Sequence, residues 1–114
     1  MPAKVAETFF SLPVHDMERA KRFYVTAFGA TVAAAFPFWT SLHIAGVRLG
    51  LGLVPEHAGG PTGLHFAVLN AAAARACVEQ AGGRVVRASV EVAPGVVVSE
   101  VTDTEGNAFA LVHR

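Results

Sequence analysis

Cysteine is almost absent from this chain, which has one among its 114 residues. A single cysteine cannot form an internal disulfide, so a secreted fold held together by disulfide bonds is excluded. An excess of either charge is also lacking, because nine lysines and arginines balance nine aspartates and glutamates. Nucleic-acid-binding proteins and polybasic membrane-surface proteins normally carry surplus positive charge, so neither class is expected.

Long hydrophobic runs are missing as well. No stretch reaches the roughly 18 uninterrupted apolar residues of a membrane-spanning helix, and residues 1–7 lack the apolar core of a signal peptide. We therefore expect a soluble, cytoplasmic protein with a reduced thiol and no membrane partner.

Apolar side chains, in contrast, are abundant. Hydrophobic residues make up 53% of the sequence and charged residues 16%, which excludes a disordered chain. A chain of 114 residues is typical of one domain, so residues 1–114 are expected to share one core. The apolar surplus favours self-association or an apolar ligand cavity.

The first half of the chain predicts a strand, a helix and three more strands. The expected strands cover residues 8–14, 31–36, 39–44 and 47–53. The helix is expected from Met17 to Phe28, because apolar residues recur every three or four positions between a capping Asp16 and a terminating Gly29.

The second half repeats this order. Strands are expected over 64–69, 84–92, 96–102 and 108–113, with an alanine-rich helix over 71–81 capped by Asn70. Cys77 falls on the apolar face of that helix and is expected to be a buried, inert thiol. Residues 27–32 and 81–86 align at the two helix ends, which indicates an internal duplication. Module 1 then spans about 5–54, a linker 55–63, and module 2 about 64–114.

Several motifs at matching places carry a family resemblance. They are Pro13-Val14-His15-Asp16, Ala20-Lys21-Arg22-Phe23-Tyr24, Gly29, His65, Gly82-Gly83 and Asp103-Thr104-Glu105-Gly106-Asn107. With these motifs the chain resembles the vicinal oxygen chelate superfamily, which includes glyoxalase I, extradiol dioxygenases, fosfomycin-resistance enzymes and bleomycin-type antibiotic-binding proteins.

The resemblance implies an α+β fold in which two βαβββ modules form a curved, half-open, cup-shaped mixed sheet with the helices outside. It also implies a homodimer in which modules from two chains complete each cup, sometimes with an exchanged N-terminal segment. Family enzymes hold a divalent metal in the cup through four side chains, usually His, Gln or Glu.

The family's metal positions are mostly filled by residues that cannot bind a metal through their side chains. Counted from Asp16 and Gly29, three positions fall on Phe9, Gly50 and Ala110, which have no donor atom. The fourth falls on His65, or on Gly63 if the two-residue difference between the modules lies elsewhere. We therefore expect no metal and no cofactor.

The same substitutions predict an apolar cup with a few polar groups. The candidate ligand-binding residues are Phe9, Phe36, Phe38, Trp39, His43, Arg48, Gly50, Gly52, His65, Glu100 and Ala110. The aromatic residues are expected to stack on a flat ligand. The two glycines free one strand face for close approach of a ligand or another backbone. Trp39 also fits core or dimer packing, Phe9 also fits the core, and Arg48 and Glu100 also fit exposed strand positions.

The expected function is metal-free sequestration of a hydrophobic, aromatic small molecule or antibiotic, as in the superfamily's antibiotic-binding resistance members. The balanced charge favours a neutral ligand. The alternative is a metal-dependent, glyoxalase-like lyase or isomerase that uses His65 with ligands such as His43, Glu100 or Glu56. A third possibility is an accessory protein whose cup is filled by its own side chains.

Overall fold

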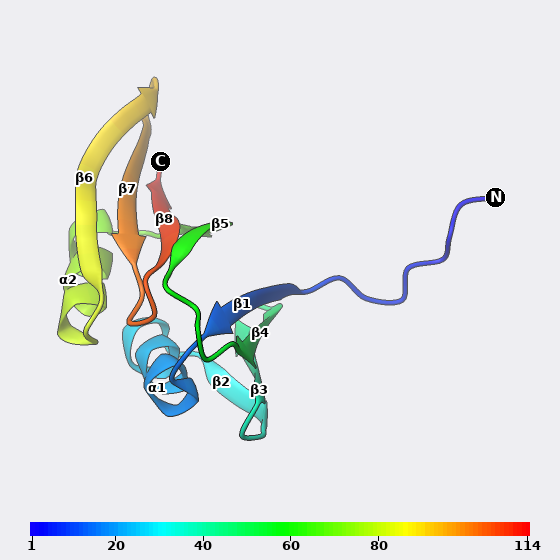
Figure 1. Ribbon diagram of the computed structural model, residues 1–114. Helices are drawn as coiled ribbons and strands as arrows, with labels where there is room; N and C mark the ends of the chain where they lie inside the picture. The colour runs from blue at the N-terminus through cyan, green and yellow to red at the C-terminus, as the bar shows by residue number, and fades with distance from the viewer.

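The computed structural model describes residues 1–114 as two βαβββ modules (Figure 1). Module 1 consists of β1 (Phe10–Val14), α1 (Met17–Phe28), β2 (Thr31–Ala35), β3 (Trp39–Ile44) and β4 (Val47–Leu53). Module 2 consists of β5 (Gly60–Ala67), α2 (Ala71–Gln80), β6 (Arg84–Ala93), β7 (Val96–Thr102) and β8 (Asn107–His113). The α+β fold and the repeated βαβββ order predicted from the sequence are confirmed.

Each module forms its own four-stranded mixed sheet. The strand orders are β1-β4-β3-β2 and β5-β8-β7-β6, and no strand of one sheet pairs with a strand of the other. The pairs β1–β4 and β5–β8 are parallel, and the remaining pairs are antiparallel. The two-residue turn between β3 and β4 is possible because Ala45 and Gly46 both adopt positive φ, 49° and 78°.

Both helices begin where their capping residues predict. The Asp16 side chain accepts a hydrogen bond from the backbone N–H of Arg19 at 3.1 Å, and Asn70 caps α2 in the same way. Gly29 ends α1 in the left-handed conformation at φ 66°. Helix α1 has 12 residues and α2 has 10.

Apart from shifts of one or two residues at the ends of several elements, such as β1 beginning at Phe10, two details differ from the sequence predictions. Cys77 is exposed rather than buried, because α2 buries only the narrow stripe around Val78. Strand β5 begins at Gly60 rather than at residue 64, because Gly60 and Pro61 already pair with β8 before the register shifts ahead of His65.

Helix α1 packs against both sheets and joins the modules into one core. Its Phe28 ring lies 4.7 Å from the Phe66 ring of β5 and 5.9 Å from the Phe109 ring of β8, centroid to centroid. Because side chains alternate along a strand, His65 and Ala110 lie on the opposite face of their sheet from these rings. In module 1 the helix covers the face bearing Leu12, Leu49 and Leu51, so the face bearing Gly50 and Gly52 also points outward. The two outer faces of one chain therefore point away from the shared helix layer and not toward one another.

The closing turn of module 2 is bound to the start of α1 in module 1. The Glu105 side chain is fully buried and accepts hydrogen bonds from the backbone N–H groups of His15 (3.1 Å) and Asp16 (2.8 Å) and from Nε of Arg19 (2.9 Å). The Tyr24 hydroxyl donates to Asp103 at 2.6 Å. Burial, reinforced by Asp103, raises the pKa of Tyr24 well above its ordinary value, which keeps this hydroxyl protonated as a donor.

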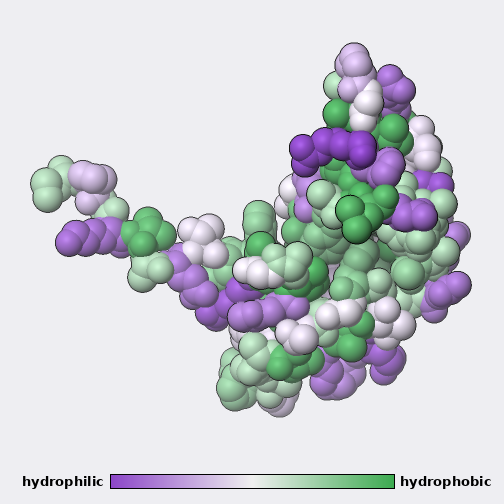
Figure 2. Space-filling view, turned by 180° about the vertical axis from the view of Figure 1, so that it is seen from behind, coloured by the Kyte–Doolittle hydropathy of each residue, from purple (hydrophilic) through white to green (hydrophobic).

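Residues 1–9 precede the first strand, are exposed and form no helix or strand. Glu7 and Phe9 contact module 1, and the N-terminal end extends away from the rest of the chain in both views (Figures 1 and 2). Neither helix is long and apolar enough to cross a membrane.

Candidate functional site

Trp39 lies on the two glycines of β4 on the outer face of module 1. A Cβ atom at Gly50 would collide with Cζ2 of the Trp39 indole, and one at Gly52 would meet Cζ3 at 3.4 Å. The indole N–H donates to Oγ of Ser41 at 2.9 Å. The close approach that the glycines allow is therefore made by the chain's own tryptophan.

Phe9 and Arg48 extend this surface beside Trp39. The Phe9 ring meets the indole edge to face at a centroid distance of 6.4 Å, and Cζ of Arg48 lies 4.5 Å from the Phe9 centroid. Arg48 donates to Glu7 at 2.9 Å, and His43 is its partner across the β3–β4 ladder. We call Phe9, Trp39, His43 and Arg48, with the glycines beneath, the aromatic half-site.

The outer face of module 2 carries a row of three residues that we call the His65 row. His65 pairs with Ala110 across β5 and β8, and Ala110 pairs with Glu100 across β8 and β7. All three residues line a hollow of about 240 Å³. The structure thus groups the candidates His65, Glu100 and Ala110 on one sheet, and Phe9, Trp39, His43, Arg48, Gly50 and Gly52 on the other.

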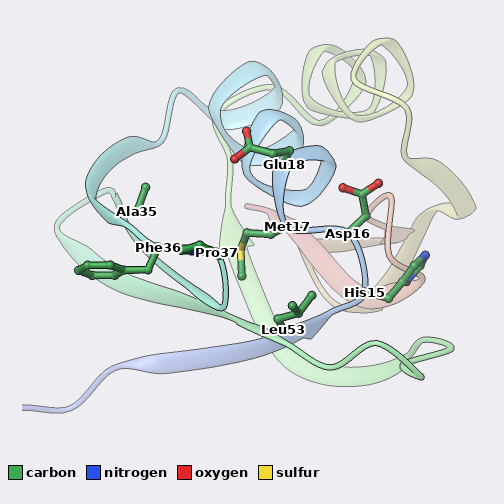
Figure 3. Close-up of a pocket in the computed structure, with 8 residues that line it drawn as sticks. All are labelled: His15, Asp16, Met17, Glu18, Ala35, Phe36, Pro37 and Leu53. Atoms are coloured by element: carbon green, nitrogen blue, oxygen red, sulfur yellow. The ribbon is translucent and has the colours of Figure 1, made fainter.

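Phe36 and Phe38 are placed apart from both groups. Their rings stack on each other at 6.3 Å, and neither makes an aromatic contact with Phe9 or Trp39. Phe36 borders a hollow of about 670 Å³ at the start of α1, where Met17 and Leu53 lie near the middle and the Phe36 ring points outward (Figure 3).

The residues at the family's metal positions do not fit a divalent ion. Two residues compete for the fourth position. Gly63 lies seven residues before the Asn70 cap, as Phe9 does before Asp16, whereas His65 lies opposite Ala110 in the β5–β8 ladder. Phe9, Gly50 and Ala110 have no side-chain donor, so the set holds at most the one imidazole of His65, and no group of three His, Cys, Asp or Glu side chains forms in the chain.

Sequence reasoning missed three features of the site. Ser41 could have been found, because it lies two residues from Trp39 on the same strand face. Nothing in the sequence pairs Glu7 with Arg48. An apolar groove of about 390 Å³ between the sheets was also missed, since it depends on how the modules pack; it is lined by Phe10, Phe28, Ile44, Ala45, Val47, Leu64, His65, Phe66, Ala67 and Val68.

Comparisons with known proteins agree with this architecture. Residues 7–41 match the family model of the bleomycin resistance protein-like N-terminal region. A search of curated proteins found no match.

Solved structures of similar fold cover nearly the whole chain. A fosfomycin resistance protein of Listeria monocytogenes superposes with a TM-score of 0.81 at 14% identity, over 100% of this chain and 95% of its own. A glyoxalase-related enzyme of Fulvimarina pelagi gives 0.79 at 20% identity, over 96% and 89% of the two chains. A glyoxalase/bleomycin resistance protein/dioxygenase family enzyme of Burkholderia phytofirmans gives 0.76 at 16% identity, over 92% and 95%.

The resemblance expected from the sequence is thereby confirmed. This chain has the fold of the glyoxalase/bleomycin resistance/dioxygenase superfamily, the vicinal oxygen chelate proteins, and residues 7–41 of its first module match a bleomycin resistance protein-like model.

Proposed function

We propose that this protein binds and sequesters a flat, hydrophobic small molecule against Trp39, without a metal. The observation that supports the proposal is that three contacts fix the position of the indole. It packs against Gly50 and Gly52, donates a hydrogen bond to Ser41 and makes an edge-to-face contact with Phe9. A ring fixed in this way loses little conformational freedom when a ligand stacks on it.

The energetics of such a site are sufficient for useful affinity. Burying about 300 Å² of apolar ligand surface contributes about 7 kcal/mol. Aromatic stacking adds about 1 kcal/mol, and a total of about 8 kcal/mol corresponds to a micromolar Kd before ordering costs. The donor-free side chains at the family's metal positions favour this passive role over metal-assisted catalysis.

Tryptophan fluorescence tests the proposal directly, because Trp39 is the only tryptophan. Titration with a panel of flat aromatic drugs is expected to quench its emission with micromolar Kd for at least one class. Trp39→Phe is expected to weaken that ligand several-fold by calorimetry, since phenylalanine offers a smaller stacking surface. The proposal fails if no member of the panel changes the emission or gives heat, or if protein purified without chelator carries a stoichiometric divalent metal.

A homodimer is part of the proposal, because the ligand needs a second wall. In one chain the aromatic half-site and the His65 row lie on outer faces that do not meet. Apolar side chains remain exposed on module 1, with Phe9 41% and Phe10 49% accessible, and hydrophobic side chains cover the middle of the face seen in Figure 2.

Sedimentation equilibrium tests the dimer. We expect a species of twice 11.9 kDa at micromolar concentration. A chain shortened to begin at residue 8 removes Glu7 and tests whether the extended residues contribute. A purely monomeric protein at high micromolar concentration would refute a binding site formed between two copies of the chain.

A further inference from the structure

The His65 row has hydrogen-bonding capacity that the chain itself does not use. Glu100 makes no side-chain hydrogen bond or ion pair, although it borders the same hollow as His65. Thr62, the other residue of the hollow with a polar side chain, already donates its hydroxyl to the carbonyl of Ala108 at 2.8 Å. The remaining lining residues are Pro61, Gly63, Leu64, Val98, Ala108, Phe109 and Ala110.

The free capacity of His65 is that of an acceptor. Its Nδ1 lies 2.9 Å from the backbone carbonyl of Gly63, and a carbonyl can only accept, so Nδ1 carries the proton. In the neutral imidazole the other nitrogen, Nε2, then has a free lone pair. The Glu100 carboxylate is likewise an acceptor when ionised. The hollow therefore presents two acceptors and no free side-chain donor.

Ala110 leaves the space between these acceptors open. It stands between His65 and Glu100 in the ladder, and strands lie about 4.8 Å apart, so the two outer residues are separated by about 10 Å at the backbone. A methyl group at the centre forms a shallow floor that a larger side chain would fill.

We propose that the His65 row recognises a nitrogen group bearing N–H donors, an amine or amidine, carried by the flat aromatic ligand. This rests on the proposed function, since it specifies the polar end of the same ligand. An N–H group satisfies Nε2 of His65 and the Glu100 carboxylate, whereas a carboxylate on the ligand would face two acceptors and like charge. The ring of the ligand would lie on the aromatic half-site of the second copy.

Matched naphthalene probes test this assignment. We expect 2-naphthamidine to bind at least tenfold more tightly than 2-naphthoate by isothermal titration calorimetry, with unsubstituted naphthalene between them. Glu100→Gln is expected to reduce the ratio of the two Kd values by about tenfold, because it removes the charge-assisted hydrogen bond. Ala110→Leu is expected to weaken the amidine and leave naphthalene closer to its original Kd.

Matched substitutions on the same sheet provide the controls. Glu91→Gln removes a carboxylate and Ala93→Leu adds a large side chain at exposed positions of β6 outside the hollow, and both should leave the ratio unchanged. If naphthoate binds as well as naphthamidine, or if Glu100→Gln leaves the ratio of their Kd values unchanged, the His65 row does not recognise N–H donors. The proposed binding of aromatic ligands at Trp39 would not be affected by that result. If none of the three probes binds, both proposals are overturned.

Discussion

Replacing Glu105 by alanine is expected to lower the free energy of unfolding by about 3 kcal/mol. The carboxylate is fully buried and accepts hydrogen bonds from two backbone N–H groups at the start of α1, from Arg19 and from the Thr104 hydroxyl. Its removal leaves these backbone donors without partners inside the protein, and a hydrogen bond to a charged group contributes about 1.5–3 kcal/mol. It also deprives Arg19 of its counter-ion.

Urea denaturation with and without the substitution measures this effect. Arg19→Ala is the matched control, because it removes the ion pair and leaves the backbone hydrogen bonds of Glu105 intact. Its side chain is 38% exposed, so its loss is expected to stay below about 1 kcal/mol. Equal losses for the two variants would show that the ion pair, and not the backbone donors, is the main contribution.

The pH dependence of stability gives an independent check on Glu105. Burial on its own raises the pKa of this carboxyl, but hydrogen bonds from Arg19, the backbone of Asp16 and Thr104 outweigh burial and hold the pKa below its ordinary 4.5. The folded state therefore favours the ionised form. Its stabilisation is present above pH about 4.5 and is lost as the pH falls through the folded pKa. The stability difference between the natural protein and Glu105→Gln should shrink over this acidic range.

Gly50→Ala is expected to abolish aromatic binding while leaving the fold intact. The added methyl group would occupy the position of the Trp39 six-membered ring, so the indole would be displaced from its position against β4. Gly50 has no positive φ, so the backbone accepts alanine without strain. With the stacking surface displaced, we expect the Kd for an aromatic ligand to rise by a factor of about 100, equivalent to about 2.7 kcal/mol.

Gly52→Ala is the control for this change. A methyl group there meets the indole at 3.4 Å, an ordinary van der Waals contact, so the ring keeps its place. A red shift of tryptophan emission is expected for Gly50→Ala and not for Gly52→Ala, in step with the loss of binding. Unchanged affinity in Gly50→Ala would show that the ligand does not use the Trp39 surface.

Much of the fold could be predicted because the ends of its helices and the turn between β3 and β4 are determined by residues at those positions. Asp16, Asn70 and Gly29 define helix ends through their own hydrogen bonds or φ values, and the Ala45-Gly46 turn needs only two residues. The position of Cys77 was harder to predict, since α2 is nearly all alanine and its burial depends on how closely the sheet approaches. The start of β5 depends on pairing with β8, about 47 residues away, which no local pattern contains.

The site was less predictable because it depends on side-chain direction and on the packing of the modules. The sequence predicted Trp39 and Gly50 as ligand-binding candidates but did not show that the indole would cover the glycine. The choice between His65 and Gly63 depends on the pairing of β5 with β8, whose register shifts just before His65. The separation of Phe36 and Phe38 from Trp39 depends on the path of the chain between β2 and β3.

The outward orientation of both faces has a consequence for assembly. A contact between module 1 of one copy and module 2 of the next joins unlike surfaces, and each added copy brings a further pair of them. Two copies related by a twofold rotation satisfy both contacts and leave no free end, whereas a rotation that does not close into a ring leaves unlike ends that recruit further molecules into an open filament. If the proposed dimer forms, substitutions that change the angle between the two sheets are expected to produce such open assemblies.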